Sequence, residues 1–174
     1  HMPKKKRKLT RRAQADLQRR PRRCTRRLAS AKYQVGTSGF MLPKREWLEL
    51  PCLNCIEINS TFYHLPQPST IEKWKTLPPS VGVVIKASKF ITHVKRLHDV
   101  QDSWELLWNR IKPLGSKLRC ILVQLPPSFH YNEQNLERVR VMKDYIRIST
   151  PLAFEFRDIS WFQPKVYDVF KKLR

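Results

Sequence analysis

The sequence predicts an α/β protein, an incomplete TIM-type (β/α) barrel with about five of its eight strand-helix units. Short apolar runs alternate with amphipathic stretches from residue 33 onward, which is typical of repeated β-α units and a parallel sheet. A complete barrel takes about 250 residues, so residues 32–174 suffice for about five units. The last amphipathic stretch has an apolar stripe, but no further strand follows on which it can pack.

Five apolar runs are predicted to be strands. Most are nearly continuously apolar, as strands covered on both faces are. They span residues 33–38, 55–59, 81–87, 118–125 and 151–157.

Helices are predicted between the strands. Ser69 and Glu72 form a capping-box pattern that opens a helix over 69–77. A second helix follows Asp102 or Ser103 as its N-cap, a third covers 134–145, and the last begins at Pro164. The apolar stripe of the second helix comprises Trp104, Leu107, Trp108 and Ile111, and that of the last comprises Val166, Val169, Phe170 and Leu173.

A small doubly wound sheet that is complete at five strands is the alternative architecture. Its dinucleotide-binding fingerprint, G-x-G-x-x-G, is missing, because the chain has only 4 glycines and the turn at 36–39 reads GTSG.

Charge divides the chain into two parts. Its 35 Lys and Arg against 14 Asp and Glu give a net charge of +21, and residues 1–31 hold 13 of these cations with a single acid. This segment is predicted to be a disordered arm that binds nucleic acid without reading its sequence. Its first cluster also resembles a nuclear-localisation signal. The cations of the arm that are expected to contact nucleic acid are Lys4, Lys5, Lys6, Arg7, Lys8, Arg11 and Arg12.

Neither a transmembrane segment nor a secretory signal is recognisable, so an intracellular protein without membrane partners is expected. It is nuclear if the arm is native and acts in a eukaryotic cell, and otherwise cytoplasmic. The four cysteines are interpreted as reduced thiols, and the Cys52-x-x-Cys55 pair lacks a second pair at zinc-site spacing. No metal site is predicted, and no cofactor is identified.

Function is expected where the carboxyl ends of the parallel strands meet. This rim is rich in cations, neutral hydrogen-bonding groups and flat rings, a mixture that suits a phosphorylated or nucleotide-like ligand. The candidate binding residues are Thr37, Ser38, Asn59, Ser60, Thr61, Tyr63, Lys86, Arg96, Gln124, Arg157 and Trp161.

Three residues are candidates for acid-base catalysis. Glu57 and Glu155 lie inside apolar strands, so each is expected to face Lys86 or Arg157. Such a pair is either catalytic or a buried ion-pair network that closes the barrel. His93 is expected on a loop after the third strand, as a general base, a phosphate ligand or an ordinary loop histidine.

Five motifs follow one another at these strand ends: VGTSGF (35–40), EINSTFYHLP (57–66), KASKFITHVKRL (86–97), PLGSKLRCILVQLPPSF (113–129) and FEFRDISWF (154–162). In this order they resemble the YecE-like family, known as domain of unknown function 72. The resemblance covers about residues 33–173 and implies the N-terminal part of a TIM-type barrel. It marks Gly36, Thr37, Ser38, Gly39, Glu57, Asn59, Ser60, Thr61, Phe62, Tyr63, Lys86, Thr92, His93, Arg96, Gln124, Pro126, Pro127, Glu155, Arg157 and Trp161.

Two departures from the family pattern stand out. Only 14 residues separate Phe40 from the second predicted strand, so the first helix is expected to be short. The last three strand-helix units of a barrel are also missing, so self-association or a partner that completes the barrel is expected.

Three functional hypotheses follow. The first is a rim that binds a phosphate-bearing ligand, most plausibly nucleic acid, with phosphodiester or sugar-phosphate chemistry if the protein is an enzyme. The second is a non-catalytic protein that binds nucleic acid through its arm. The third is a non-functional fragment, whose open sheet edges would cause it to aggregate.

Overall fold

A computed structural model describes residues 33–40, 43–50, 53–145 and 150–172 of the chain. The predicted basic arm at residues 1–31 lies outside the described residues, and so do Cys52 and Leu173.

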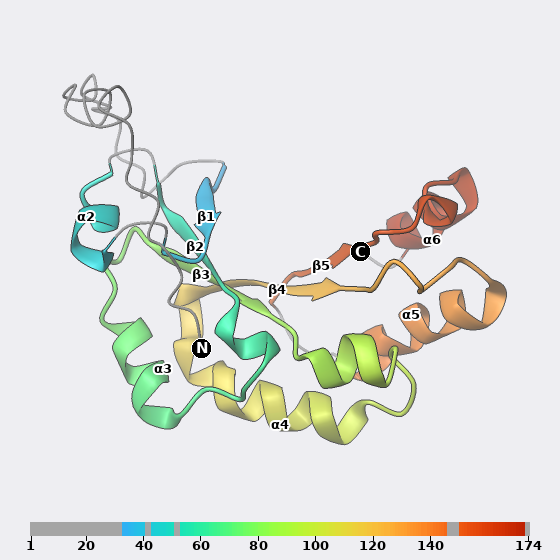
Figure 1. Cartoon of the computed structure of the whole chain (residues 1–174), viewed down its shortest axis with the longest axis horizontal. Coiled ribbons are helices and arrows are strands. Elements are labelled where there is room, and N and C mark those ends of the chain that lie inside the picture. The colour runs from blue at the N-terminus through green and yellow to red at the C-terminus, as the bar shows by residue number, and fades with distance from the viewer. Residues whose placement is uncertain (1–32, 41–42, 51–52, 146–149, 173–174) are drawn as a thin grey trace, which may run out of the picture.

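The five predicted strands are confirmed, and they form one parallel sheet in the order β1-β2-β3-β4-β5 (Figure 1). A sequential order of this kind differs from that of a doubly wound sheet, in which the order reverses, so that alternative is wrong. The strands are β1 (Gly36–Ser38), β2 (Cys55–Ile58), β3 (Gly82–Lys86), β4 (Leu118–Gln124) and β5 (Leu152–Glu155).

A helix follows each strand of the sheet. The α-helices are α2 (Lys44–Leu48), α3 (Pro68–Lys75), α4 (Gln101–Ile111), α5 (Glu133–Tyr145) and α6 (Pro164–Lys172). Short helical turns are η2 (Ser60–Phe62), the π-helical η3 (Phe90–Val94), η4 (Lys112–Lys117) and η5 (Ile159–Trp161). No helix among the described residues has the length and apolarity needed to cross a membrane.

Two predicted N-caps are wrong. The first turn of α3 begins at Pro68 with Gln67 as its cap, because a proline ring suits the first helical position, and Ser69 therefore lies inside the helix. The cap of α4 is the buried Val100, whose carbonyl accepts from the Trp104 amide at 2.7 Å. Asp102 lies instead in the first turn of α4, where its charge favours the helix dipole.

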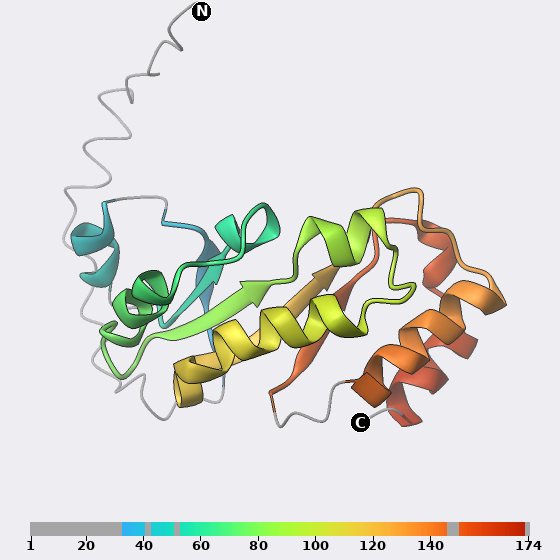
Figure 2. The same cartoon turned by 90° about the horizontal axis from the view of Figure 1, so that it is seen from below.

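The two faces of the sheet differ in what covers them. The helices lie along one face, and the β2, β3 and β4 side chains on that face, such as Ile56, Val83 and Ile121, are fully buried (Figures 1 and 2). The register of the ladders places Glu57, Val84 and Glu155 on the opposite face, where they are only half-buried. The described residues therefore form an open, one-sided sheet, and closure into a barrel stays a prediction.

Candidate functional site

The carboxyl ends of β1 and β2 carry the first polar cluster of the site. Ser38 pairs with Glu57 in the β1–β2 register, and its hydroxyl donates to Glu57 Oε1 at 2.8 Å. The side-chain amide of Asn59 donates to Ser38 Oγ at 2.6 Å. No ion pair in the described part of the chain includes Glu57, so the expected pairing of Glu57 with Lys86 or Arg157 is wrong.

The ends of β4 and β5 carry the second cluster, which centres on a paired charge. Glu155 Oε1 accepts from Gln124 Nε2 at 2.6 Å and from Arg157 Nε at 3.0 Å, as the sequence predicted for Arg157. Partial burial opposes ionisation of the carboxyl group, but these two donors and the charges of Arg157 and Lys86 outweigh it. The pKa of Glu155 is therefore lowered from its ordinary value, and the group is a carboxylate at neutral pH.

Between the two clusters, β3 ends in Lys86, which faces the aromatic rings of the segment after β2. Its ammonium lies 5.0 Å from the centre of the Phe62 ring. The other neighbours of Phe62 are His93 and Tyr63, each edge-on at 5.0 Å. Tyr63 is 69% exposed, so the outer part of this aromatic group is open to a ligand.

The protonation state of His93 is set by its neighbours. Its Nδ1 lies 2.9 Å from the hydroxyl of the buried Thr92, and the same hydroxyl lies 3.0 Å from the Ser88 carbonyl. The hydroxyl has one proton to donate, so the tautomer of the ring is coupled to whether that proton goes to the Ser88 carbonyl or to Nδ1.

Burial and four surrounding cations lower the pKa of His93. Partial burial makes the largest contribution, followed by the positive charges of Lys86, Arg157, Lys89 and Arg96. The imidazole is therefore neutral at pH 7, and a strong positive field surrounds it.

The segment that carries His93 has unusual backbone geometry. The turn η3 is a π-helix, a rare conformation that is frequent at functional sites. It is followed by Arg96, Leu97 and Asp99, whose φ angles are 49°, 62° and 45°. For residues other than glycine such angles cost on the order of 1 kcal/mol each, and they concentrate at functional sites. Arg96 Nη2 donates to Ser128 Oγ at 3.2 Å, which links this segment to the end of β4.

A family model described as "Protein of unknown function DUF72" matches residues 40–174. The chain belongs to the DUF72 family. Within it, the UPF0759 protein YunF of Bacillus subtilis is 30% identical over 120 residues, which are 65% of this chain and 42% of YunF.

Solved DUF72 structures share the fold. A family member from Thermotoga maritima has a TM-score of 0.67 at 26% identity, over 80% of this chain and 61% of that protein. One from Enterococcus faecalis has a TM-score of 0.61 at 20% identity, over 74% of this chain and 53% of that one. The chain spans less than two thirds of the length of each of these relatives.

Several residues that the DUF72 resemblance marks are buried and stabilise the fold. Thr61, Gln124 and Trp161 are at most 7% exposed. Trp161 stacks on Phe156 at 4.2 Å and donates its indole N–H to the Phe129 carbonyl at 2.6 Å. Its ring is thus part of the core, contrary to its predicted role as a flat surface for a ligand.

Other marked residues hold the ends of the strands together. The Thr61 hydroxyl contacts the carbonyls of Ile58 and Lys86 at 2.8 and 2.7 Å. Thr37 donates to the Gly39 carbonyl and accepts from the indole of Trp47, both at 2.7 Å. These contacts shape the DUF72 rim without offering groups to a ligand.

Two residues of the site were missed by the sequence analysis. Lys89 contributes to the positive field at His93 and lies four residues before it. Residues at this spacing are neighbours on a helix, but a loop was expected here, so the spacing gave no signal. Ser128 follows the Pro126-Pro127 pair of the family motif and accepts from Arg96.

The cysteines and histidines of the described DUF72 residues do not gather into a metal site. No group of three or more potential ligands occurs among the residues placed by the structure. Cys55 and Cys120 are free thiols, and burial raises the pKa of each, which keeps them in the unreactive thiol form.

Proposed function

We propose that this DUF72 protein binds a phosphate-bearing ligand, with nucleic acid as the first candidate, at the carboxyl ends of its strands. The observation that carries the proposal is the positive field of Lys86, Lys89, Arg96 and Arg157 around His93. Negatively charged phosphate oxygens are attracted to such a cluster of cations, and a guanidinium group binds them through two hydrogen bonds at once. The exposed ring of Tyr63 adds a surface on which a base can stack.

The same geometry supports phosphodiester or sugar-phosphate chemistry as a second step. The neutral imidazole of His93 is suited to take a proton from an attacking hydroxyl or water, and the cations balance the charge that develops on phosphate. Glu57 contacts only neutral donors within the described site, which keeps it a candidate acid-base group. Glu155 is suited to position Arg157, because its charge is already neutralised by that guanidinium.

Binding of a labelled single-stranded oligonucleotide to the full chain, followed by fluorescence anisotropy, tests the rim. Arg157→Ala and Lys86→Ala are each expected to weaken binding about tenfold, since a hydrogen bond to a charged group contributes about 1.5–3 kcal/mol. Arg45→Ala is the matched control, because this side chain is 93% exposed on α2 and its loss changes the net charge equally. In the rim variants, the slope of log K against log salt concentration should become shallower by about 0.7 for each phosphate contact that is lost.

Nucleic-acid binding through the arm alone is the second candidate, favoured by the 13 cations of residues 1–31. Replacing Lys4, Lys5, Lys6, Arg7 and Lys8 together by glutamine, in the full chain, separates the two. If this variant loses all binding while Arg157→Ala behaves like Arg45→Ala, the arm is the binding element and the rim proposal is wrong. If ribose 5-phosphate displaces the oligonucleotide from the wild type but not from Arg157→Ala, the result supports binding at the rim.

A further inference from the structure

Two exposed apolar side chains lie on the π-helical turn η3, and the proposed function does not use them. Phe90 is 48% exposed and Val94 is 61% exposed, whereas Ile91 and Thr92 between them are fully buried. The backbone amide of Lys95 donates to the Phe90 carbonyl at 2.8 Å, which closes the wide turn. The buried pair therefore fixes the turn against the core, and Phe90 and Val94 lie on its outer side.

The surroundings of Phe90 are cationic. Lys89 and Lys95 cap the two ends of η3, and the Lys95 ammonium lies 6.0 Å from the centre of the Phe90 ring. Lys89 and the exposed Arg96 are also among the cations whose charge acts on His93. The ring thus shares its surroundings with the proposed phosphate site.

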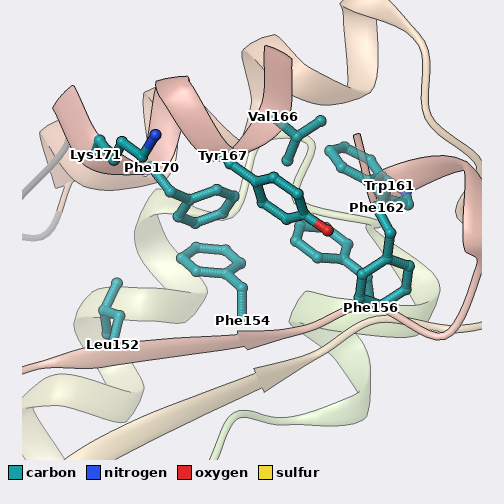
Figure 3. A pocket seen from close by; sticks show the side chains of 9 residues that line it. All are labelled: Leu152, Phe154, Phe156, Trp161, Phe162, Val166, Tyr167, Phe170 and Lys171. Carbon is teal, nitrogen blue, oxygen red and sulfur yellow. The ribbon is translucent and has the colours of Figure 1, made fainter. Parts of the chain in front are cut away.

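An exposed ring elsewhere in the molecule has different neighbours. Tyr167 is also 48% exposed, but it lies on α6 and lines a groove beside β5 (Figure 3). Among the nine residues that line this groove, Lys171 is the one cation. Apolar surroundings suit an apolar contact. A ring among cations, such as that of Phe90, suits a ligand with both negative charges and flat faces, and nucleic acid has both.

The exposed ring of Tyr63 lies on the neighbouring turn. The turns η2 and η3 follow the adjacent strands β2 and β3 and lie side by side (Figures 1 and 2). Phe62 connects them, because its ring is edge-on to Tyr63 and to His93, at 5.0 Å from each. A nucleic-acid strand held by the cations of the rim therefore meets exposed rings on both turns.

Exposed rings discriminate between single and double strands. In a duplex the faces of the bases are stacked on one another, whereas in a single strand they are free to stack on a protein ring. Phosphate contacts alone favour the duplex, because its charge density is higher. Stacking contributes about 1–3 kcal/mol per base, which is enough to reverse that preference.

We propose that Phe90 and Tyr63 stack on unpaired bases, so that the rim selects single-stranded nucleic acid over duplex. This inference rests on the proposed function and names the class of nucleic acid that the same site binds.

Three labelled probes of equal length test this inference on the full chain by fluorescence anisotropy. They are a single strand of thymidines, its duplex with a strand of adenosines, and a single strand of abasic sites, which keeps the phosphates and has no bases. Phe90→Ala is expected to weaken binding of the thymidine strand about tenfold and to change binding of the other two by less than about twofold. Tyr63→Ala should give the same pattern, and Phe90→Tyr, which keeps a ring, should bind like the wild type.

Tyr167→Ala is the matched control, because it removes a ring of equal exposure from α6 and leaves η2 and η3 intact. It should leave the binding of all three probes unchanged. Circular dichroism shows whether the variants fold. The arm is the same in all of them, so the ratio of single-strand to duplex affinity reports on the rings alone.

Two results would overturn the inference, and Arg157→Ala distinguishes them. If Phe90→Ala and Tyr63→Ala change the three affinities equally or not at all, while Arg157→Ala weakens all three, the rim binds phosphate without stacking and the proposed function stands. If Arg157→Ala binds every probe as Arg45→Ala does, the proposed function fails and the inference fails with it.

Discussion

Glu57 and Glu155 lie at the ends of strands β2 and β5, on the same face of the sheet, and their surroundings are different. Glu57 accepts from the neutral hydroxyl of Ser38, whereas Glu155 is held by the guanidinium of Arg157 and the amide of Gln124. The charged partner and the amide hold Glu155 in place, and they lower the pKa of its carboxyl group. Within the proposed function, this difference favours a positioning role for Glu155 and leaves Glu57 as the candidate acid-base group.

Trp161 packs in the core beneath the side of the rim that carries Glu155. Of the substitutions considered, removal of its ring should lower the free energy of unfolding most. Trp161→Ala is expected to lower the free energy of unfolding by about 3–5 kcal/mol, since it opens a cavity between Phe129 and Phe156. Urea denaturation measures it. Trp161→Phe keeps most of the packing and loses mainly the bond to the Phe129 carbonyl, so it should cost clearly less. A small effect of the alanine variant would mean that Trp161 is not a core residue.

On the other side, Thr61 joins the end of β2 to the end of β3. Thr61→Val removes the hydroxyl that contacts the carbonyls of the buried Ile58 and the half-buried Lys86, so a loss of about 1–3 kcal/mol in unfolding free energy is expected. Thr76→Val is the control, because the exposed Thr76 hydroxyl makes a similar bond to Lys73 that water can replace. Equal effects of the two variants would contradict a special role of Thr61.

Glu155 should also couple the stability of the fold to pH. Because the folded-state pKa of Glu155 is lowered, its contribution is complete above the unfolded-state pKa of about 4.3 and disappears as the pH falls through the folded value. The stability difference between the wild type and Glu155→Gln is therefore largest at neutral pH and vanishes in acid. It should stay below about 1 kcal/mol, since this ion pair is partly exposed and screened.

Urea titrations at several pH values measure this difference, with Glu105→Gln on the exposed face of α4 as the control. A difference that grows as the pH falls would mean that the pKa of Glu155 is raised in the folded protein, and it would reverse the roles assigned to the two carboxylates.

The sheet was predictable because its strands are buried and their sequences are therefore nearly continuous apolar runs. The order of the strands along the chain is also their order in space, so the polar residues that follow them were correctly expected at one edge. The starts of α3 and α4 were missed because Pro68 and the buried backbone of Val100 outweigh nearby serine and aspartate caps.

The partners within the rim were harder to predict. The Ser38–Glu57 contact depends on the register of β1 against β2, which no local pattern reveals. Trp161 and Tyr63 look alike in sequence as aromatic residues near strand ends, yet one is in the core and the other is exposed. The π-helical turn that carries His93 has no apolar periodicity of its own, so it was interpreted as a loop.

Double-mutant cycles test the comparison at its finest scale. The coupling energy of Ser38→Ala with Glu57→Gln, and that of Arg157→Ala with Glu155→Gln, should each be a few tenths of a kcal/mol up to about 1. Only the second joins two full charges, so raising the salt concentration from about 0.1 M to about 1 M should diminish it, while the coupling of Ser38 with Glu57 persists. If both couplings fall together with salt, Glu57 feels the cations of the rim as strongly as Glu155 does, and the separation of their roles fails.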